Sequence, residues 1–185
     1  MRSRAVVSLL VALEYNVTQL EGGHKQYRRY VREKLEQYII KPKLVVLWGL
    51  TCSGKTALLS HFPNALNLEH LAQHRGSLYG GIGLTPNTQK RFESLLLQQL
   101  EQLNQEKYIL IEGESKRIGR VVMPAFLSTA IKNGMHVFVQ RSLENRASLA
   151  MTEYFTAADD ITKIKEITLN LKKVISMKDK NTVVQ

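Results

Sequence analysis

The chain has 185 residues, 44% of them hydrophobic, and 26 lysines and arginines against 16 aspartates and glutamates give it a formal net charge of +10. This hydrophobic share excludes a disordered chain, and no segment approaches the length needed to cross a membrane. The positive charge favours a polyanionic partner such as nucleic acid, although a lysine-rich surface without such a partner would have the same composition. Cys52 is the only cysteine, so an internal disulfide is excluded and a reducing, cytoplasmic setting is expected.

The first part of the chain predicts three short elements. Residues 5–13 are typical of an apolar helix, and residues 17–20 are typical of a strand. Residues 24–38 have helical periodicity, with apolar and tyrosine side chains on one face and lysines and arginines on the other. This basic face is either a solvated connecting surface or a contact for RNA phosphates.

A phosphate-binding P-loop is the central motif. An apolar run over 44–48 predicts a buried strand that ends at Gly49, and Gly54, Lys55 and Thr56 complete the G-x-x-x-x-G-K-[ST] spacing. The glycines permit a close approach of the backbone, so the loop amides and the following helix N-terminus can bind an anion. Lys55 supplies positive charge to the outer phosphates, and the Thr56 hydroxyl is placed to bind Mg²⁺ where a metal accompanies the phosphate.

A second loop follows a short helix predicted over 68–74. Four glycines and a proline lie between residues 75 and 86, so this segment is predicted to be a loop. It is either a mobile surface loop or a substrate-binding loop, and we favour the second interpretation. Its candidate contact groups are His74, Arg75, Ser77 and Tyr79.

Charged residues of both signs follow the next predicted strand. A helix over 88–104 leads to an apolar strand over 108–111, and Glu112 and Glu114 come next. P-loop proteins place a carboxylate here to bind a metal or its water, or to act as a base, and either glutamate can do either job. Three cations that would share the carboxyl edge of the sheet come directly afterwards: Lys116, Arg117 and Arg120.

The remaining sequence predicts further α/β elements. A helix over 124–132 precedes residues 136–139, which are predicted to form a third buried strand. Arg141 and Arg146 then either approach the phosphates or form surface salt bridges. A lysine-rich amphipathic helix is expected over 159–180. Together the elements predict an α/β, P-loop NTPase-like, three-layer sandwich around a mainly parallel sheet.

Four segments, in this order, carry a family resemblance. They are LEGGHKQYRR at 20–29, the P-loop GLTCSGKT, LEHLAQHRGSLYGGIG, and IEGESKRIGRVVMP. The last two contain motifs that are not general features of P-loop proteins. On these motifs the chain resembles bacterial tRNA 2-selenouridine synthase from its first residues to about Tyr154.

The resemblance implies a two-part enzyme, in which a rhodanese-like domain with a reactive cysteine precedes a P-loop domain. The family converts 2-thiouridine at the tRNA wobble position to 2-selenouridine through S-geranyl-2-thiouridine, using geranyl diphosphate and then selenophosphate. We therefore expect residues 1–30 to be the C-terminal remnant of the rhodanese-like domain and residues 31–42 to be a basic linker helix. Residues 43–185 are expected to be a P-loop domain that is truncated at its C-terminus.

The P-loop pattern and the resemblance together predict roles for individual residues. The catalytic candidates are Lys55, Glu112 and Glu114, and the metal candidate is Thr56. The diphosphate, a nucleotide or a related phosphate group would be held by Gly49, Ser53, Gly54, Lys55 and Thr56. Substrate or tRNA phosphates would be held by Arg75, Lys116, Arg117 and Arg120.

One departure from the family concerns the cysteine. Cys52 lies inside the P-loop, where the family usually has glycine, so it is not expected to replace the rhodanese cysteine. That residue is expected outside this chain, and a separate rhodanese-like chain is a candidate partner. Two alternatives therefore stay open: an ATP-dependent small-molecule kinase, and a non-catalytic fragment that binds phosphate and RNA.

Overall fold

The computed structural model describes residues 2–154 and 158–170 and divides the chain into two compact units, Met1–Ile39 and Ile40–Gln185. The first unit contains α1 (Arg2–Ala12) and α2 (Gly23–Glu36). The predicted strand over 17–20 is wrong, because these residues pair with no strand in the described parts of the chain. Helix α2 runs through residue 30, and the assignment of residues 1–30 to a rhodanese-like domain stays a prediction.

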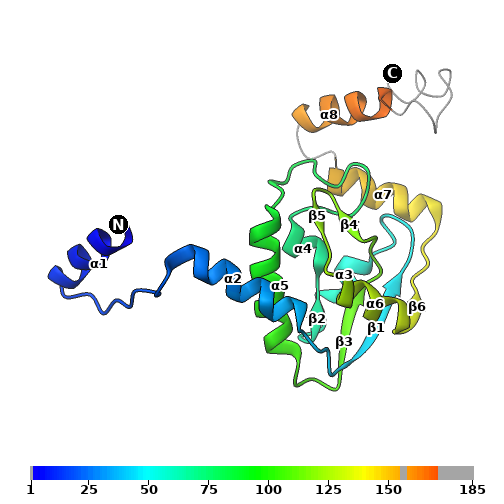
Figure 1. The fold of residues 1–185 in the computed structure, drawn as a ribbon. Helices are drawn as coiled ribbons and strands as arrows, with labels where there is room; N and C mark the ends of the chain where they lie inside the picture. Colours follow the sequence, from blue (N-terminus) through cyan, green and yellow to red (C-terminus); the bar gives the residue numbers. More distant parts are fainter. Residues whose placement is uncertain (1, 155–157, 171–185) are drawn as a thin grey trace. The chain divides into compact units, whose positions relative to one another are not determined.

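The second unit is built on a four-stranded parallel sheet with the order β2-β3-β1-β6 (Figure 1). These strands are β1 (Lys43–Trp48), β2 (Ala65–Leu66), β3 (Tyr108–Glu112) and β6 (Met135–Phe138). Strand β1 has a neighbour on each side, which explains its nearly continuous apolar sequence. In its pairing with β3, Leu47 lies opposite Glu112, so the P-loop and the glutamates begin at the same edge of the sheet.

Helices alternate with these strands and flank the sheet, which confirms the predicted α/β P-loop class. The helices of this unit are α3 (Lys55–Leu59), α4 (Leu68–Ala72), α5 (Gln89–Leu103), α6 (Ala125–Asn133), α7 (Leu143–Tyr154) and α8 (Ala158–Leu169). Helix α3 contacts β3, and α6 contacts β1. A small antiparallel pair, β4 (Arg117–Ile118) and β5 (Val121–Val122), lies outside the main sheet.

Apolar side chains from the strands and helices form the core. Leu47, Leu59 and Leu110 pack together and join the sheet to α3. Helix α5 begins after Thr88, whose side chain accepts a hydrogen bond from the Arg91 amide at 3.3 Å and so caps the helix. Its buried residues are Phe92, Leu96, Leu97, Leu100 and Leu103.

Strand β6 forms at the predicted place, but the prediction that it is buried is wrong. All four of its residues are exposed, including Phe138 at 63%. The strand pairs only with β1 and lies at an edge of the sheet, so its apolar side chains are not enclosed as those of β1 are. The helix predicted over 159–180 is seen as α8 up to Leu169, and residues 171–180 lie outside the described part of the chain.

Among the described residues, no helix combines the length and the apolar character required to span a membrane.

Candidate phosphate-binding site

The P-loop joins the end of β1 to the start of α3 and depends on glycine at two places. A Cβ on Gly49 would lie 2.5 Å from the Val139 carbonyl oxygen and 2.6 Å from Ser53 Oγ, which is too close for any side chain. Gly54 has a φ of 94° and precedes the first residue of α3. Only glycine adopts this conformation without strain, so the loop turns tightly and its amides can face a bound anion.

The polar side chains of the loop surround the same place. Lys55 Nζ donates to the carbonyl oxygens of Gly49 and Leu50, at 2.9 and 3.3 Å. Ser53 is 6% exposed, and its buried hydroxyl has no hydrogen-bond partner among the described residues. A buried hydroxyl without a partner is costly, and an incoming phosphate oxygen would supply one.

A cavity of about 140 Å³ lies over this loop. Its walls come from the P-loop, α4, the loop after α4, the segment after β3, and the end of α7. The lining residues are Gly49, Thr51, Cys52, Ser53, Gly54, Lys55, Thr56, Ala57, Glu69, Arg75, Gly76, Ser77, Gly113, Glu114, Glu153 and Tyr154. The structure thus brings the predicted P-loop residues, Arg75 and Glu114 together around one cavity.

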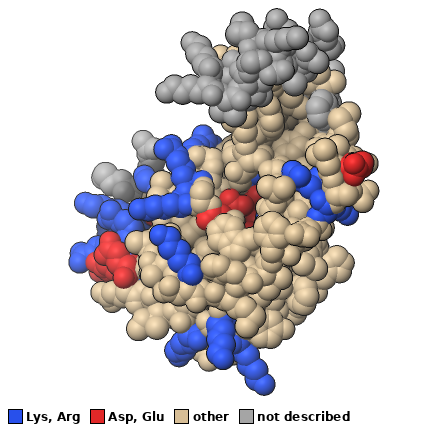
Figure 2. All heavy atoms as spheres, turned by 90° about the vertical axis from the view of Figure 1, so that its right-hand side faces the viewer, with Lys and Arg blue, Asp and Glu red and all other residues tan. Residues whose placement is uncertain are grey.

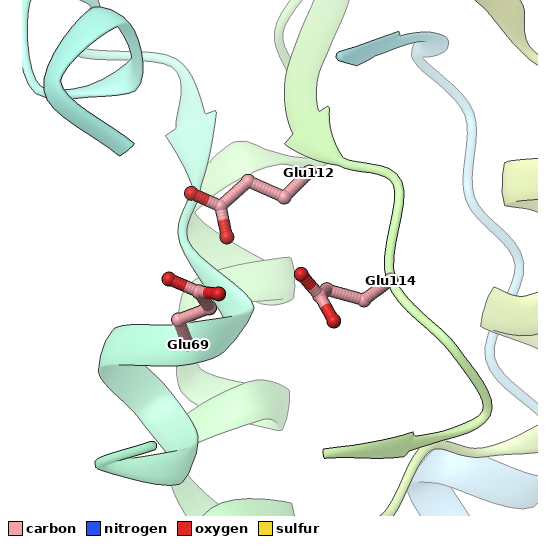
Figure 3. A group of neighbouring side chains, drawn as sticks. All are labelled: Glu69, Glu112 and Glu114. Carbon is pink, nitrogen blue, oxygen red and sulfur yellow. The ribbon is translucent and has the colours of Figure 1, made fainter. Parts of the chain in front are cut away.

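Three carboxylates converge beside the P-loop (Figure 3). Glu112 ends β3, Glu114 lies two residues further on, and Glu69 comes from α4. One carboxylate oxygen from each residue can be chosen so that all three lie within 4.8 Å of one another. The Thr56 hydroxyl donates to Glu69 Oε2 at 3.2 Å and joins the P-loop to this cluster.

The cluster holds its protons tightly. Burial, followed by repulsion from Glu112 and Glu114, raises the pKa of Glu69 to about 8. Burial also raises the pKa of Glu112 to about 7 and is the main cause of the raised pKa of Glu114. The Thr56 hydroxyl and Lys55 lower the pKa of Glu112 in part, yet neither Glu112 oxygen has a partner with hydrogen-bond geometry among the described residues.

Two glycines make room for this arrangement. A Cβ on Gly76 would lie 2.5 Å from the Glu114 carboxylate, and the φ of Gly76 is 45°. A Cβ on Gly113 would lie 2.3 Å from the Trp48 ring, so glycine lets the backbone cross that ring between the two glutamates. Gly76 therefore leaves room for the Glu114 carboxylate, and Gly113 leaves room for the Trp48 ring.

The loop after α4 is held against α7. The Arg75 guanidinium lies 5.1 Å from the centre of the Tyr154 ring, and its Nη1 donates to the Ile82 carbonyl at 2.8 Å. Ser77 and Tyr154 share a hydroxyl–hydroxyl hydrogen bond of 2.8 Å. These contacts place Arg75 at the cavity wall, whereas Tyr79 bonds to Thr168 of α8 instead.

The three cations that follow Glu114 are placed differently. Lys116, Arg117 and Arg120 are exposed on and around the β4–β5 pair and do not line the cavity. Arg117 Nε donates to the Gly119 carbonyl at 3.1 Å, and the Arg120 guanidinium bonds to the Pro86 carbonyl. Figure 2 shows acidic atoms near the middle of one face with lysine and arginine side chains on either side.

The two arginines after β6 lie near the P-loop. Arg146 Nε donates to the Thr51 carbonyl oxygen at 2.9 Å. Arg141 lies with Leu50, Phe138 and Arg146 along a second cavity, of about 480 Å³, that shares Ser53 with the first. Of the two roles left open by the sequence, proximity to the P-loop is the one that this geometry favours.

Sequence reasoning missed Glu69, and it missed Glu153 and Tyr154 at the end of α7. Glu69 lies on a helix of five residues that follows a strand of only two, so nothing local marks it as a neighbour of Glu112. It reaches the site because β2 pairs with β3 in parallel, which brings the ends of both strands to one edge. Glu153 and Tyr154 reach the cavity from a helix whose sequence carries no motif.

A parallel sheet, a glycine-bounded loop before a helix, and a lysine and threonine at its end define a P-loop phosphate-binding domain. Residues 42–173 match the family model described as the tRNA 2-selenouridine synthase AAA domain, so the chain belongs to this family.

Three curated relatives, each called tRNA 2-selenouridine synthase, extend the comparison. The protein of Alcanivorax borkumensis is 34% identical over 156 residues, covering 83% of this chain and 43% of the relative. That of Sulfurovum sp. is 33% identical over 169 residues, covering 90% and 46%. That of Hydrogenovibrio crunogenus is 34% identical over 168 residues, covering 85% and 46%. The chain thus spans less than half the length of these relatives.

Among solved structures, a DNA replication initiation factor is similar with a TM-score of 0.30 and 13% identity, covering 93% of this chain and 62% of that one. This likeness is too distant to carry an argument about fold or function.

Proposed function

We propose that this chain supplies the phosphate-binding part of an enzyme that modifies 2-thiouridine in tRNA, and that its P-loop binds the diphosphate of geranyl diphosphate. The observation that carries this is the P-loop itself: amides, Lys55 and an unpartnered Ser53 hydroxyl around one cavity in a chain of this family. The net charge of +10 supports tRNA as the partner. We keep the cytoplasm as the expected location.

A groove beside the P-loop, lined by apolar side chains together with Arg141 and Arg146, supports a prenyl diphosphate over a nucleotide. Leu50 and Phe138 are 60% and 63% exposed and line the second cavity, which meets the phosphate cavity at Ser53. A geranyl chain bound there would bury these side chains while its diphosphate occupied the P-loop. Burial of apolar surface contributes about 25 cal/mol per Å², so the groove adds affinity that inorganic diphosphate cannot obtain.

The proposed first step is an alkylation of sulfur. A sulfur lone pair of 2-thiouridine attacks C1 of the geranyl group, and the electron pair of the C1–O bond leaves with the diphosphate. Lys55 and the loop amides stabilise the charge that develops on this leaving group. The proton lost from N3 of the base is taken up by a carboxylate, for which Glu114 at the cavity wall is our candidate, with Glu112 behind it.

A divalent cation such as Mg²⁺ would neutralise further charge on the diphosphate, and Thr56 fits as one of its ligands. In the second proposed step, the selenium of selenophosphate attacks C2 of the base, the C2–S bond breaks and geranylthiol leaves. Water then cleaves the Se–P bond, which releases phosphate and 2-selenouridine. That step belongs to the whole enzyme, including a rhodanese-like part supplied by a longer protein or a partner chain. The arginines and lysine assigned to tRNA, Arg75, Lys116, Arg117 and Arg120, would hold its phosphates during both steps.

The test uses the purified chain with tRNA that contains 2-thiouridine and with geranyl diphosphate, and the nucleosides are analysed by mass spectrometry. We expect S-geranyl-2-thiouridine with the wild type, none with Lys55→Ala, and normal yield with Lys107→Ala, an exposed lysine distant in sequence from the P-loop. Phe138→Asp should weaken geranyl diphosphate binding and leave inorganic diphosphate binding unchanged.

Two other outcomes would reject this proposal. Binding of geranyl diphosphate and RNA without any product would indicate a non-catalytic binding fragment. Turnover of ATP without geranyl transfer would favour the kinase, for which the supporting observation is the carboxylate cluster beside Lys55 and Thr56.

A further inference from the structure

The three carboxylates of the cluster carry negative charge that no ion pair among the described residues offsets. Glu69, Glu112 and Glu114 lie together, yet no lysine or arginine within the described ranges forms an ion pair with any of them. The charge of Lys55 acts on all three carboxyl groups, but its ammonium donates hydrogen bonds to two loop carbonyls instead. Carboxylates so close together either take up protons or need a cation to offset their repulsion.

Glu112 is the residue of this cluster that points most directly to a ligand. Its side chain is 0% exposed, and both of its oxygens lack a hydrogen-bond partner in the described structure. Figure 3 shows its carboxylate directed toward those of Glu69 and Glu114. A buried carboxyl group whose oxygens accept no hydrogen bond is costly, so Glu112 points to a further partner within the cluster.

The geometry suits a hard divalent cation. The three chosen oxygens lie within 4.8 Å of one another. Oxygen ligands lie about 2.0–2.6 Å from Mg²⁺, Mn²⁺ or Ca²⁺, so two ligands of one ion are separated by at most about 5 Å. All-oxygen sets of carboxylates and hydroxyls are what these cations prefer over softer metals.

We propose that Glu69, Glu112 and Glu114 form a divalent-cation site that is filled before any phosphate binds. In this site Glu69 and the Thr56 hydroxyl link the cation to the P-loop. In most P-loop proteins Mg²⁺ binds together with the nucleotide, and phosphate oxygens supply several of its ligands. Here three carboxylates of the protein supply ligands, so the cation can bind without a phosphate.

The site also explains two features of the cavity wall. Gly76 leaves the space that the Glu114 carboxylate occupies, so a side chain there would push Glu114 out of the cluster. Glu69 and Glu114 line the same cavity as Lys55 and the P-loop, so a phosphate bound there would contact the cation's open positions. The inference does not depend on which phosphorylated ligand the P-loop takes.

The test measures binding of Mn²⁺ alone to the metal-free chain, without phosphate, by electron paramagnetic resonance and calorimetry at pH 7.5. We expect one ion per chain and at least a tenfold loss of affinity in Glu69→Gln and in Glu114→Gln. Glu101→Gln, which removes an exposed carboxylate of α5, should bind as the wild type does. Gly76→Ala should also weaken binding, although no ligand is removed.

A further variant separates this inference from the proposed function. Lys55→Ala should lose diphosphate binding and keep Mn²⁺ binding, because the lysine is not a ligand of the ion. The inference is overturned if the wild type binds Mn²⁺ only in the presence of diphosphate, or if Glu69→Gln and Glu101→Gln behave alike. Circular dichroism shows whether each variant has folded. If Glu69→Gln does not fold, the Mn²⁺ affinity of Glu114→Gln provides an independent test.

Discussion

Raising the pH should destabilise the metal-free protein, because the carboxylate cluster binds protons more tightly in the folded chain than in the unfolded one. Glu112 has an ordinary pKa of 4.5, and burial raises it to about 7. The folded state therefore carries more protons between these values, and the free energy of unfolding falls as the pH rises through this window. Because the pKa of Glu69 is raised to about 8, the free energy of unfolding continues to fall above pH 7.

The size of the effect follows from Glu112 alone. A tenfold change in proton affinity is worth about 1.4 kcal/mol, so a pKa raised from 4.5 to about 7 corresponds to a loss on the order of 3 kcal/mol between pH 4.5 and 8. Because the three glutamates share their protons, we count this amount once for the whole cluster. It is a large fraction of the stability of a typical domain.

The assay is urea unfolding in EDTA at pH 5, 6, 7 and 8, repeated with Glu112→Gln. We expect a falling stability in the wild type and a smaller fall in the variant, which keeps Glu69 and Glu114 but lacks the ionisation of Glu112. His74 acts in the opposite direction, because burial lowers its pKa below 6.5 and its contribution grows as the pH rises toward that value. The variant keeps His74, so the difference between the curves reports on the cluster. Equal slopes in the two proteins would refute the reasoning.

Three other changes test the surroundings of the site. Cys52→Gly should raise the free energy of unfolding by up to about 1 kcal/mol, because Cys52 has a φ of 60° and glycine relieves this strain at some entropic cost. Tyr154→Phe should lower it by about 1 kcal/mol through loss of the hydrogen bond to Ser77, and no change would mean that the bond is absent in solution. Replacing Arg117 and Arg120 with alanine should weaken tRNA binding and reduce its salt slope by about 1 for each phosphate that the protein no longer neutralises; an unchanged slope would remove them from the RNA surface.

The sequence was sufficient for the parts of the site that are local in the chain. The spacing from Gly49 to Thr56 predicts the turn between β1 and α3. Each residue type in these eight positions meets a requirement for backbone conformation or for phosphate binding. Glu112 and Glu114 are likewise found from the end of one apolar strand. Both predictions need no knowledge of what packs against these segments.

Features that depend on neighbouring elements were not predictable in this way. An apolar run of four residues does not distinguish an edge strand from a central one, so β6 was expected to be buried and is exposed. The run over 17–20 has strand composition but no partner strand in the described chain. Glu69 enters the cluster only through the pairing of β2 with β3, which joins residues 45 positions apart in the sequence, such as Ala65 and Leu110.

The position of the cluster beside an anion-binding loop has a thermodynamic consequence. Three carboxylates next to the P-loop repel an incoming diphosphate, and a cation among them turns this repulsion into attraction. By linkage, the factor by which Mn²⁺ tightens diphosphate binding equals the factor by which diphosphate tightens Mn²⁺ binding.

We expect Mn²⁺ to strengthen binding of inorganic diphosphate at least tenfold in the wild type and by much less in Glu69→Gln. Titrations of each ligand at fixed free concentrations of the other, corrected for the complex that they form in solution, give both factors. Glu101→Gln provides the matched control. If Glu69→Gln shows the wild-type factor, the cation that assists phosphate binding is held by Thr56 and the ligand itself, and the glutamates act only as proton-binding groups.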